Sequence, residues 1–279
     1  MRSAARALVM AFTYAGTVVG AGFASGQEIL QFFTKYGKFA AAAILVASVL
    51  FVWLGTKSML LARRISAVSY ADLNAHLFGE AWGRRISGSM FVFLMAVSSV
   101  MLAGAGSVLE QYAGLAYETG LLLTAALVYA VLLRGLSGVK SVNAVVVPLM
   151  LAFLSTVFAF TMQSPAAARF LRFATDEPAW RLWLSPFLYA AFNLTLAQAV
   201  LVPLGASAPD ERTIRLAGFL GGGFITVMLL ACHVTLASPM PRIVPFEIPM
   251  GWVGAPPGAA VRAPRAPVRL PRIFLPPSS

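Results

Sequence analysis

The sequence predicts an all-α integral membrane protein. Hydrophobic residues make up 59% of the 279 residues and charged residues only 11%, whereas a soluble domain has roughly 25% charged residues. The mean hydropathy is +0.81. Several apolar runs have about 20 residues, the length of a membrane-spanning helix and twice that of a barrel strand. We therefore expect a multi-pass bundle of about seven spanning helices in the cell (inner or plasma) membrane, surrounded by the lipid bilayer.

The net charge of +11 does not indicate a nucleic-acid partner, because the basic residues follow the loops between the apolar segments. A cytoplasmic N-terminus places the larger set of basic residues inside, which is the orientation that we predict. The inside set is Arg2, Arg6, Arg63, Arg64, Arg84, Arg85, Arg134, Lys140, Arg212 and Arg215, and the outside set is Lys35, Lys38, Arg169, Arg172, Arg181 and Arg242. With one cysteine and no cluster of metal ligands, the sequence predicts no disulfide and no metal site.

The first apolar segment, from about Ala4 to Phe33, is unusual in length and composition. As one helix its roughly 30 residues would measure about 45 Å, against a hydrocarbon core of about 30 Å. Four glycines lie between Gly16 and Glu28, where an ordinary spanning helix would carry leucines. Ser25 and Glu28 have the spacing of a capping box, which predicts that a second half-helix starts there. We therefore expect the first helix to be broken.

Six further apolar segments follow. The sixth segment of the chain, counted from the N-terminus, again has an interrupted pattern. The six further segments span about Lys38 to Ala62, Ile86 to Tyr112, Gly120 to Leu133, Val142 to Met162, Leu182 to Leu204 and Ile214 to Leu236. We expect a short surface helix before Arg84 and a basic loop from Arg134 to Lys140. Pro186 and Pro203 in the sixth segment predict a second broken helix. Gly221-Gly222-Gly223 in the seventh lacks the lysine and serine of a phosphate loop.

The character of the chain changes after residue 238. Eleven prolines with interleaved arginines lie between Pro239 and Ser279, and no apolar run there is long enough to span a membrane. The composition predicts a disordered or polyproline-like tail, 239–279, that follows a transmembrane domain, 1–238.

Broken first and sixth helices at the head of two groups of segments are typical of transporters built from inverted repeats. The run Gly16-Thr17-Val18-Val19-Gly20-Ala21-Gly22-Phe23-Ala24-Ser25-Gly26-Gln27-Glu28, with Tyr189, Phe192-Asn193 and Val202-Pro203-Leu204-Gly205, resembles the YkvI-type membrane protein family. That family is similar to the amino acid–polyamine–organocation superfamily, which implies the inverted-repeat helical bundle of LeuT. The resemblance covers roughly residues 5–250. It implies a first repeat at about 4–162 and a partial second repeat at about 182–238.

Such a bundle would continue with at least three further helices. Phe246-Glu247-Ile248-Pro249 resembles the approach to the eighth helix, after which the sequence turns to proline, arginine and alanine. We therefore expect a truncation or frameshift at the gene level and an incomplete bundle. Coupling-ion residues on the eighth helix are not carried over.

An unwound stretch at membrane depth would offer backbone N–H and C=O groups to a ligand. Free N–H groups at Ser25-Gly26-Gln27 suit a carboxylate, and carbonyl groups near Gly16 to Val19 suit an ammonium group. An amino acid or similar zwitterion carries both charges. The candidate substrate-binding residues are Gly20, Ala21, Gly22, Phe23, Ala24, Ser25, Gly26, Gln27, Tyr189, Asn193 and Gln198.

Each of these features also has a structural interpretation. Gly16-x-x-x-Gly20 and Gly22-x-x-x-Gly26 are small-residue helix-packing motifs, and only the resemblance favours an unwound site over packing. Asn193 and Gln198 suit interhelical hydrogen bonds equally well. For Glu28, the acid of the first segment, capping is favoured over the alternative of a coupling proton carrier.

The function that follows is secondary transport of a small solute, above all an amino acid or similar zwitterion. Alternating access would occur around helices 1 and 6, with Na+ or H+ as the candidate coupling ion and no cofactor. The alternative is a non-transporting membrane protein, either a receptor-like or structural subunit, or an inactive truncated fragment. An enzyme is not expected, because the sequence has no paired-carboxylate, metal-ligand or nucleophile constellation.

Overall fold

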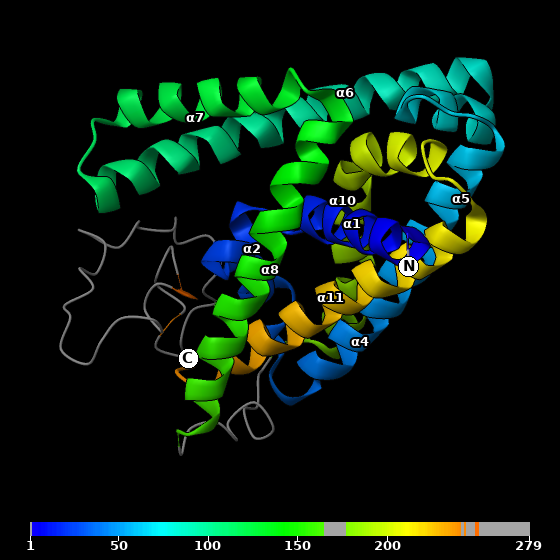
Figure 1. The fold of residues 1–279 in the computed structure, drawn as a ribbon. Helices are drawn as coiled ribbons and strands as arrows, with labels where there is room; N and C mark the ends of the chain where they lie inside the picture. Colours follow the sequence, from blue (N-terminus) through cyan, green and yellow to red (C-terminus); the bar gives the residue numbers. More distant parts are fainter. Residues whose placement is uncertain (1, 165–176, 241–242, 244–248, 251–279) are drawn as a thin grey trace, which may run out of the picture.

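The computed structural model describes residues 2–164, 177–240, 243 and 249–250, and every regular element in these ranges is helical. In chain order the elements are α1 (Arg2–Val18), α2 (Ala21–Ser25), α3 (Gln27–Phe32), the 3-10 helix η1 (Thr34–Phe39), α4 (Ala40–Leu50), the π-helical turn η2 (Phe51–Gly55), α5 (Thr56–Arg64), α6 (Tyr70–Ala113), α7 (Tyr117–Leu132), α8 (Gly135–Met162), α10 (Ala179–Ala206) and α11 (Glu211–Ala237) (Figure 1).

Five helical runs in the described ranges are long and apolar enough to cross a membrane. They are Thr34–Arg64, Tyr70–Gln111, Gly135–Met162, Ala179–Ala206 and Glu211–Ala237. The α1 helix has 17 residues and the apolar α7 helix has 16, so both are shorter than the length of about 20 expected of a spanning helix. The chain is an all-helical membrane protein, as its composition predicts.

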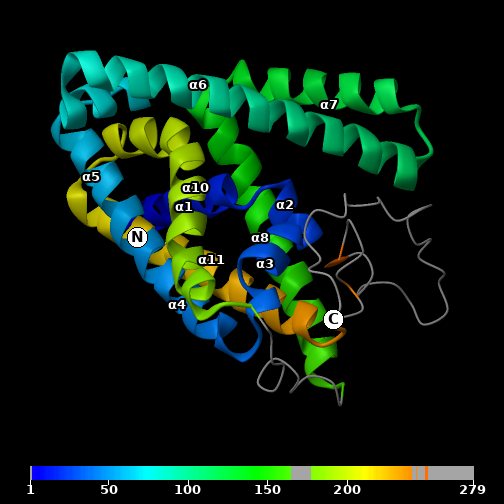
Figure 2. The ribbon, with the colours of Figure 1, turned by 180° about the vertical axis from the view of Figure 1, so that it is seen from behind.

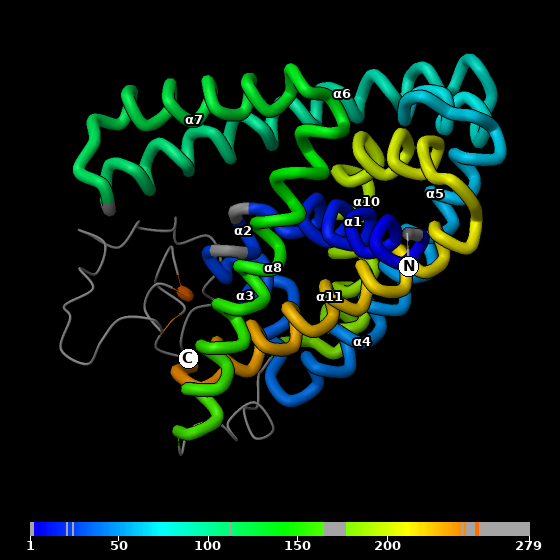
Figure 3. The backbone as a smooth tube through the Cα atoms, in the orientation of Figure 1, coloured from blue at the N-terminus to red at the C-terminus, as the bar shows by residue number. Residues whose placement is uncertain are grey.

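The helices form a compact group with a hairpin at one side. The α1 helix packs against α8, α10 and α11, and the continuous run from α4 to α5 packs against α10 and α11. The α6 and α7 helices pack against each other as an antiparallel hairpin beside this group, as both ribbon views show (Figures 1 and 2). The backbone trace shows α8 returning from the hairpin past α1 and α11 (Figure 3).

A buried tyrosine fixes α1 in this group. The Tyr14 hydroxyl donates a hydrogen bond to the carbonyl oxygen of Phe51, 2.7 Å away, at the start of the π-helical turn. The side chain of Tyr14 is fully buried. A Cβ atom at Gly55 would overlap the phenol oxygen, and one at Gly221 would lie 2.7 Å from the ring. The two glycines therefore form a slot for Tyr14 that joins α1, η2 and α11.

The glycines of α11 serve helix packing. A Cβ atom at Gly222 would overlap the Val52 side chain, and one at Gly218 would overlap Thr56. Small residues at a membrane helix interface let two backbones approach closely. Gly221 and Gly222 are thus part of a packing surface, whereas a Cβ atom at Gly223 would meet nothing within 4 Å.

The predicted break in the sixth segment is wrong for this conformation. The α10 helix is continuous from Ala179 to Ala206, with Pro186 and Pro203 inside it. Each proline removes one backbone hydrogen bond, but Pro203 lies in the last turn and α10 packs along α4, α5 and α1. These tertiary contacts keep the helix intact where the local pattern favours a break.

Two glycines with positive φ set the ends of neighbouring helices. Gly79 (φ 77°) separates a short first helix from the rest of α6, in agreement with the expected surface helix before Arg84. Gly135 (φ 55°) starts α8 directly after a turn at 133–134. The basic loop predicted from Arg134 to Lys140 is therefore wrong, because glycine permits a sharper turn than the composition suggests.

The predicted tail lies outside the described residues, except for 239–240, 243 and 249–250. Residues 165–176 of the connection before α10 also lie outside them.

We expect Tyr14→Phe to lower the free energy of unfolding by about 1–3 kcal/mol, because it leaves the buried Phe51 carbonyl without its donor. Denaturant unfolding of the purified protein in detergent micelles measures this change. Tyr129→Phe is the matched control, because Tyr129 on α7 is 66% exposed. Equal effects of the two substitutions would contradict the role given to Tyr14.

Asp210, at the end of the loop before α11, caps the N-terminus of that helix with an ionisable side chain. The Asp210 carboxylate accepts hydrogen bonds from the Thr213 amide, at 2.7 Å, and the Thr213 hydroxyl, at 2.9 Å. These bonds hold the pKa of the Asp210 carboxyl below its usual value. The cap therefore stabilises the fold above the unfolded-state pKa, and this contribution is lost as the pH falls through the lower folded-state pKa.

We expect Asp210→Asn to reduce the loss of stability on acidification, because asparagine can cap a helix without titrating. Thermal unfolding in micelles across an acidic pH series measures the effect. Glu118→Gln removes one exposed carboxylate from α7 and serves as the control. Parallel pH profiles for wild type and Asp210→Asn would show that this cap does not contribute.

Candidate functional site

The stretch between α1 and α3 combines three helix ends. Val19 and Gly20 separate α1 from α2, and Gly20 has extended backbone, with φ −99° and ψ −169°. Gly26 has φ 83°, a left-handed conformation that favours glycine. It ends α2 by donating its N–H to the Phe23 carbonyl, at 3.0 Å, and it is also the residue before α3.

Three of the four glycines between Gly16 and Glu28 lie against other helices or other parts of the chain. A Cβ atom at Gly16 would overlap Asn143 of α8, and one at Gly20 would lie 2.7 Å from Met101 of α6. A Cβ atom at Gly26 would lie 2.8 Å from Met250. These contacts agree with the packing interpretation at the three positions. Gly22 differs, because its nearest neighbour is the carboxyl group of Glu28.

Glu28 does not cap α3. The residue before that helix is Gly26, which has no side chain to cap the first turn. Ser25 is the last residue of α2, where its hydroxyl donates to the Gly22 carbonyl (3.1 Å) and accepts from the Gln27 N–H (3.3 Å). The predicted capping box is thus wrong, because the left-handed Gly26 starts α3 one residue later than the box requires.

The Glu28 carboxyl lies instead between Gly22 and α10. It faces the hydroxyl group of Tyr189. Glu28 Oε2 and Tyr189 Oη are both buried. Within the described residues, neither atom has a partner at full hydrogen-bond geometry, although the two groups are near enough to interact. The ion pairs in that part of the chain are Arg64–Glu211, Arg181–Glu177 and Arg215–Glu211, so Glu28 has no basic partner there.

Aromatic rings hold Tyr189 in place. Its ring centroid lies 5.2 Å from that of Phe32, 5.0 Å from Phe33 and 5.9 Å from Phe51. One turn earlier on α10, the Ser185 hydroxyl donates to the Phe32 carbonyl. The phenol is fully buried, so a fixed apolar wall presents its hydroxyl to Glu28.

A second buried polar pair lies nearby in the fold. The Thr34 hydroxyl and His233 Nδ1 are 3.1 Å apart and join η1 to α11. Cys232, also on α11, lies near Tyr189 and is fully buried. The sequence showed His233 as a polar residue in an apolar helix, but no local signal linked it to Thr34.

The other predicted site residues do not gather around Glu28 and Tyr189 as one group. Asn193 Nδ2 donates to the Tyr189 carbonyl of its own helix, at 3.0 Å. Gln198 Oε1 is buried without a partner among the described residues, but it lies about 14 Å further along α10 than Tyr189. Phe23 is buried, the backbone of Ala21 and Ala24 lies in α2, and Gln27 lies in the first turn of α3.

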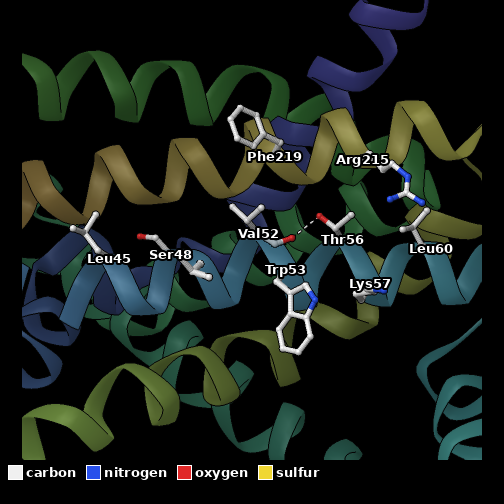
Figure 4. Close-up of a pocket in the computed structure, with 10 residues that line it drawn as sticks. Leu45, Ser48, Val52, Trp53, Thr56, Lys57, Leu60, Arg215 and Phe219 are labelled. Carbon is white, nitrogen blue, oxygen red and sulfur yellow. Dashed lines mark hydrogen bonds between the residues drawn. The ribbon is translucent and has the colours of Figure 1, made fainter. Parts of the chain in front are cut away.

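A surface hollow of about 600 Å³ lies elsewhere, between the run from α4 to α5 and α11 (Figure 4). It is lined by Leu45, Ser48, Val49, Val52, Trp53, Thr56, Lys57, Leu60, Arg215 and Phe219. Trp53 is 57% and Phe219 67% exposed, so the hollow faces the surroundings that lipid would occupy. None of the predicted substrate residues lines it.

Spanning helices with polar side chains buried between them define a multi-pass helical membrane protein. Comparison with known proteins adds a family. The chain is 41% identical over 247 residues to the uncharacterized membrane protein YkvI of Bacillus subtilis (strain 168). The aligned region covers 88% of this chain and 70% of YkvI. The chain is also 25% identical over 244 residues to the uncharacterized protein YyaD of the same organism. That alignment covers 86% of this chain and 70% of YyaD. The chain therefore belongs to the YkvI family of membrane proteins.

No protein-family model and no solved structure matches the chain.

Proposed function

We propose that the protein is a secondary transporter of a small solute, above all an amino acid or similar zwitterion. The observation that carries this proposal is the Val19–Gly26 stretch, which interrupts the first helix of a membrane protein beside the buried polar groups of Glu28 and Tyr189. Non-helical backbone at membrane depth is tolerated where it is buried in protein or lines a water-filled cavity. In transporters, such interruptions bind the charged groups of the substrate.

The arrangement of the helices supports the proposal. The helices expected to be the first, second, sixth and seventh spans, α1, α4–α5, α10 and α11, pack together. The α6–α7 hairpin lies beside them (Figure 1). In inverted-repeat transporters the substrate site lies at the interface between the two repeats, and these four helices would form that interface here.

The proposed movement is confined to the first helix. Because α10 is continuous, the changes in backbone direction available for alternating access lie at Val19–Gly20 and at Gly26. Rotation of α2 about these points, relative to the α3 helix that Phe32 joins to α10, would open the polar site to one side of the membrane. The excess of basic residues in the inside set supports a cytoplasmic N-terminus in the cell membrane.

A screen of radiolabelled amino acids tests the proposal directly. Purified protein in proteoliposomes is expected to take up at least one amino acid above protein-free vesicles when a Na+ or a proton gradient is imposed. Absence of uptake across the screen under both gradients would contradict transport and favour a non-transporting membrane protein.

We expect Gly22→Ala to reduce this uptake by on the order of tenfold or more. The added methyl group overlaps the Glu28 carboxyl, and overpacking of this kind costs about 1–3 kcal/mol. Gly88→Ala on α6 is the matched control, because a Cβ atom there meets nothing within 4 Å. Unchanged uptake by Gly22→Ala would remove this stretch from the site.

A further inference from the structure

We propose that Glu28 is a proton carrier: its carboxyl group binds a proton from water on one side of the membrane and releases it on the other. The neutral Tyr189 hydroxyl is its partner. The coupling of this proton to a solute rests on the proposed transport function, whereas the binding of the proton does not. The step forms and breaks one O–H bond of the carboxyl group and needs no other reactant.

The first argument is the lack of a compensating charge. An ionised carboxylate away from water costs several kcal/mol unless a cation pairs with it. The elements packed near α3 offer Tyr189 from α10, Cys232 and His233 from α11, and Lys35, Tyr36 and Lys38 from η1, whereas α2 has no titratable side chain. His233 bonds Thr34, and the two lysines lie over the rings of Tyr36 and Phe39. None of these cations forms an ion pair with Glu28 in the part of the chain that the structure describes.

The second argument is the buried Tyr189 hydroxyl group that the Glu28 carboxyl faces. A phenol can donate a hydrogen bond to a carboxylate and accept one from a carboxylic acid, so it suits both protonation states. Its 0% exposure and the three surrounding rings keep it at the site. A buried hydroxyl without a well-formed hydrogen bond is costly, and a protonated Glu28 that donates to the phenol oxygen would satisfy both groups.

The third argument is the place of Glu28 in the interrupted helix. Its carboxyl lies against Gly22, which belongs to α2, whereas its backbone belongs to α3. A change of angle at Gly26 would therefore separate the carboxyl from Gly22 and change its access to water. The side chain as a whole is half-buried, so such a change has a short path to solvent.

The proton site is tested by infrared difference spectroscopy of the protein in lipid between alkaline and mildly acidic buffer. We expect a C=O stretching band of a protonated carboxylic acid that is lost in Glu28→Gln. The band should shift in Tyr189→Phe, which removes the hydroxyl but keeps the ring contacts. It should persist in Glu118→Gln, which removes an exposed carboxylate. The same band in wild type and Glu28→Gln would overturn the proposal.

Uptake measurements then separate the proton carrier from the transporter. With an inward proton gradient we expect wild type to accumulate its solute inside the vesicles. In Glu28→Gln we expect the accumulation ratio, inside over outside, to be at least tenfold lower, while the solute still equilibrates across the membrane. Accumulation by Glu28→Gln at the wild-type level would overturn the proton carrier and leave transport intact. A Glu28-dependent band without any uptake by wild type would support the proton site and contradict the transport function.

Discussion

The hydrogen bond from Tyr14 to the Phe51 carbonyl fixes the position of the first helix, and the geometry of the site depends on it. The phenol ring fills a slot between Gly55 and Gly221. If α1 moved along η2 or α11, the ring would leave this slot and its hydrogen bond to Phe51 would break. The helix ends only one turn later, at Val18. In the proposed movement, a fixed α1 followed directly by non-helical backbone leaves the change of direction to α2.

The polar site follows from this division between fixed and bending parts. The Tyr189 hydroxyl belongs to the fixed part, because α10 is continuous and aromatic rings surround the phenol. The Glu28 carboxyl lies at the junction of the two parts, because it extends from α3 to contact Gly22 of α2. A buried acid whose contact with α2 would be broken by the proposed movement provides a site whose hydration depends on conformation.

Composition and the length of apolar runs were sufficient to predict the all-helical membrane class. Local patterns failed where tertiary packing or one backbone angle decides the outcome. Pro186 predicted a break, yet packing keeps α10 continuous. Ser25 and Glu28 predicted a capping box, yet the left-handed Gly26 starts α3 elsewhere. The meeting of Glu28 with Tyr189 joins residues far apart in the chain, and no local pattern in one sequence contains that information.

Amide hydrogen exchange of the protein in lipid nanodiscs tests most directly whether the interrupted first helix is a water-accessible site. Backbone amides in the middle of a packed membrane helix exchange slowly, whereas amides that open locally exchange fast. We expect the amides from Val19 to Gln27 to exchange far faster than those in the middle of α1 and α10. Equal protection across Val19–Gln27 and the middle of α1 would contradict the account, because a stretch that never opens to water could bind neither a solute nor a proton.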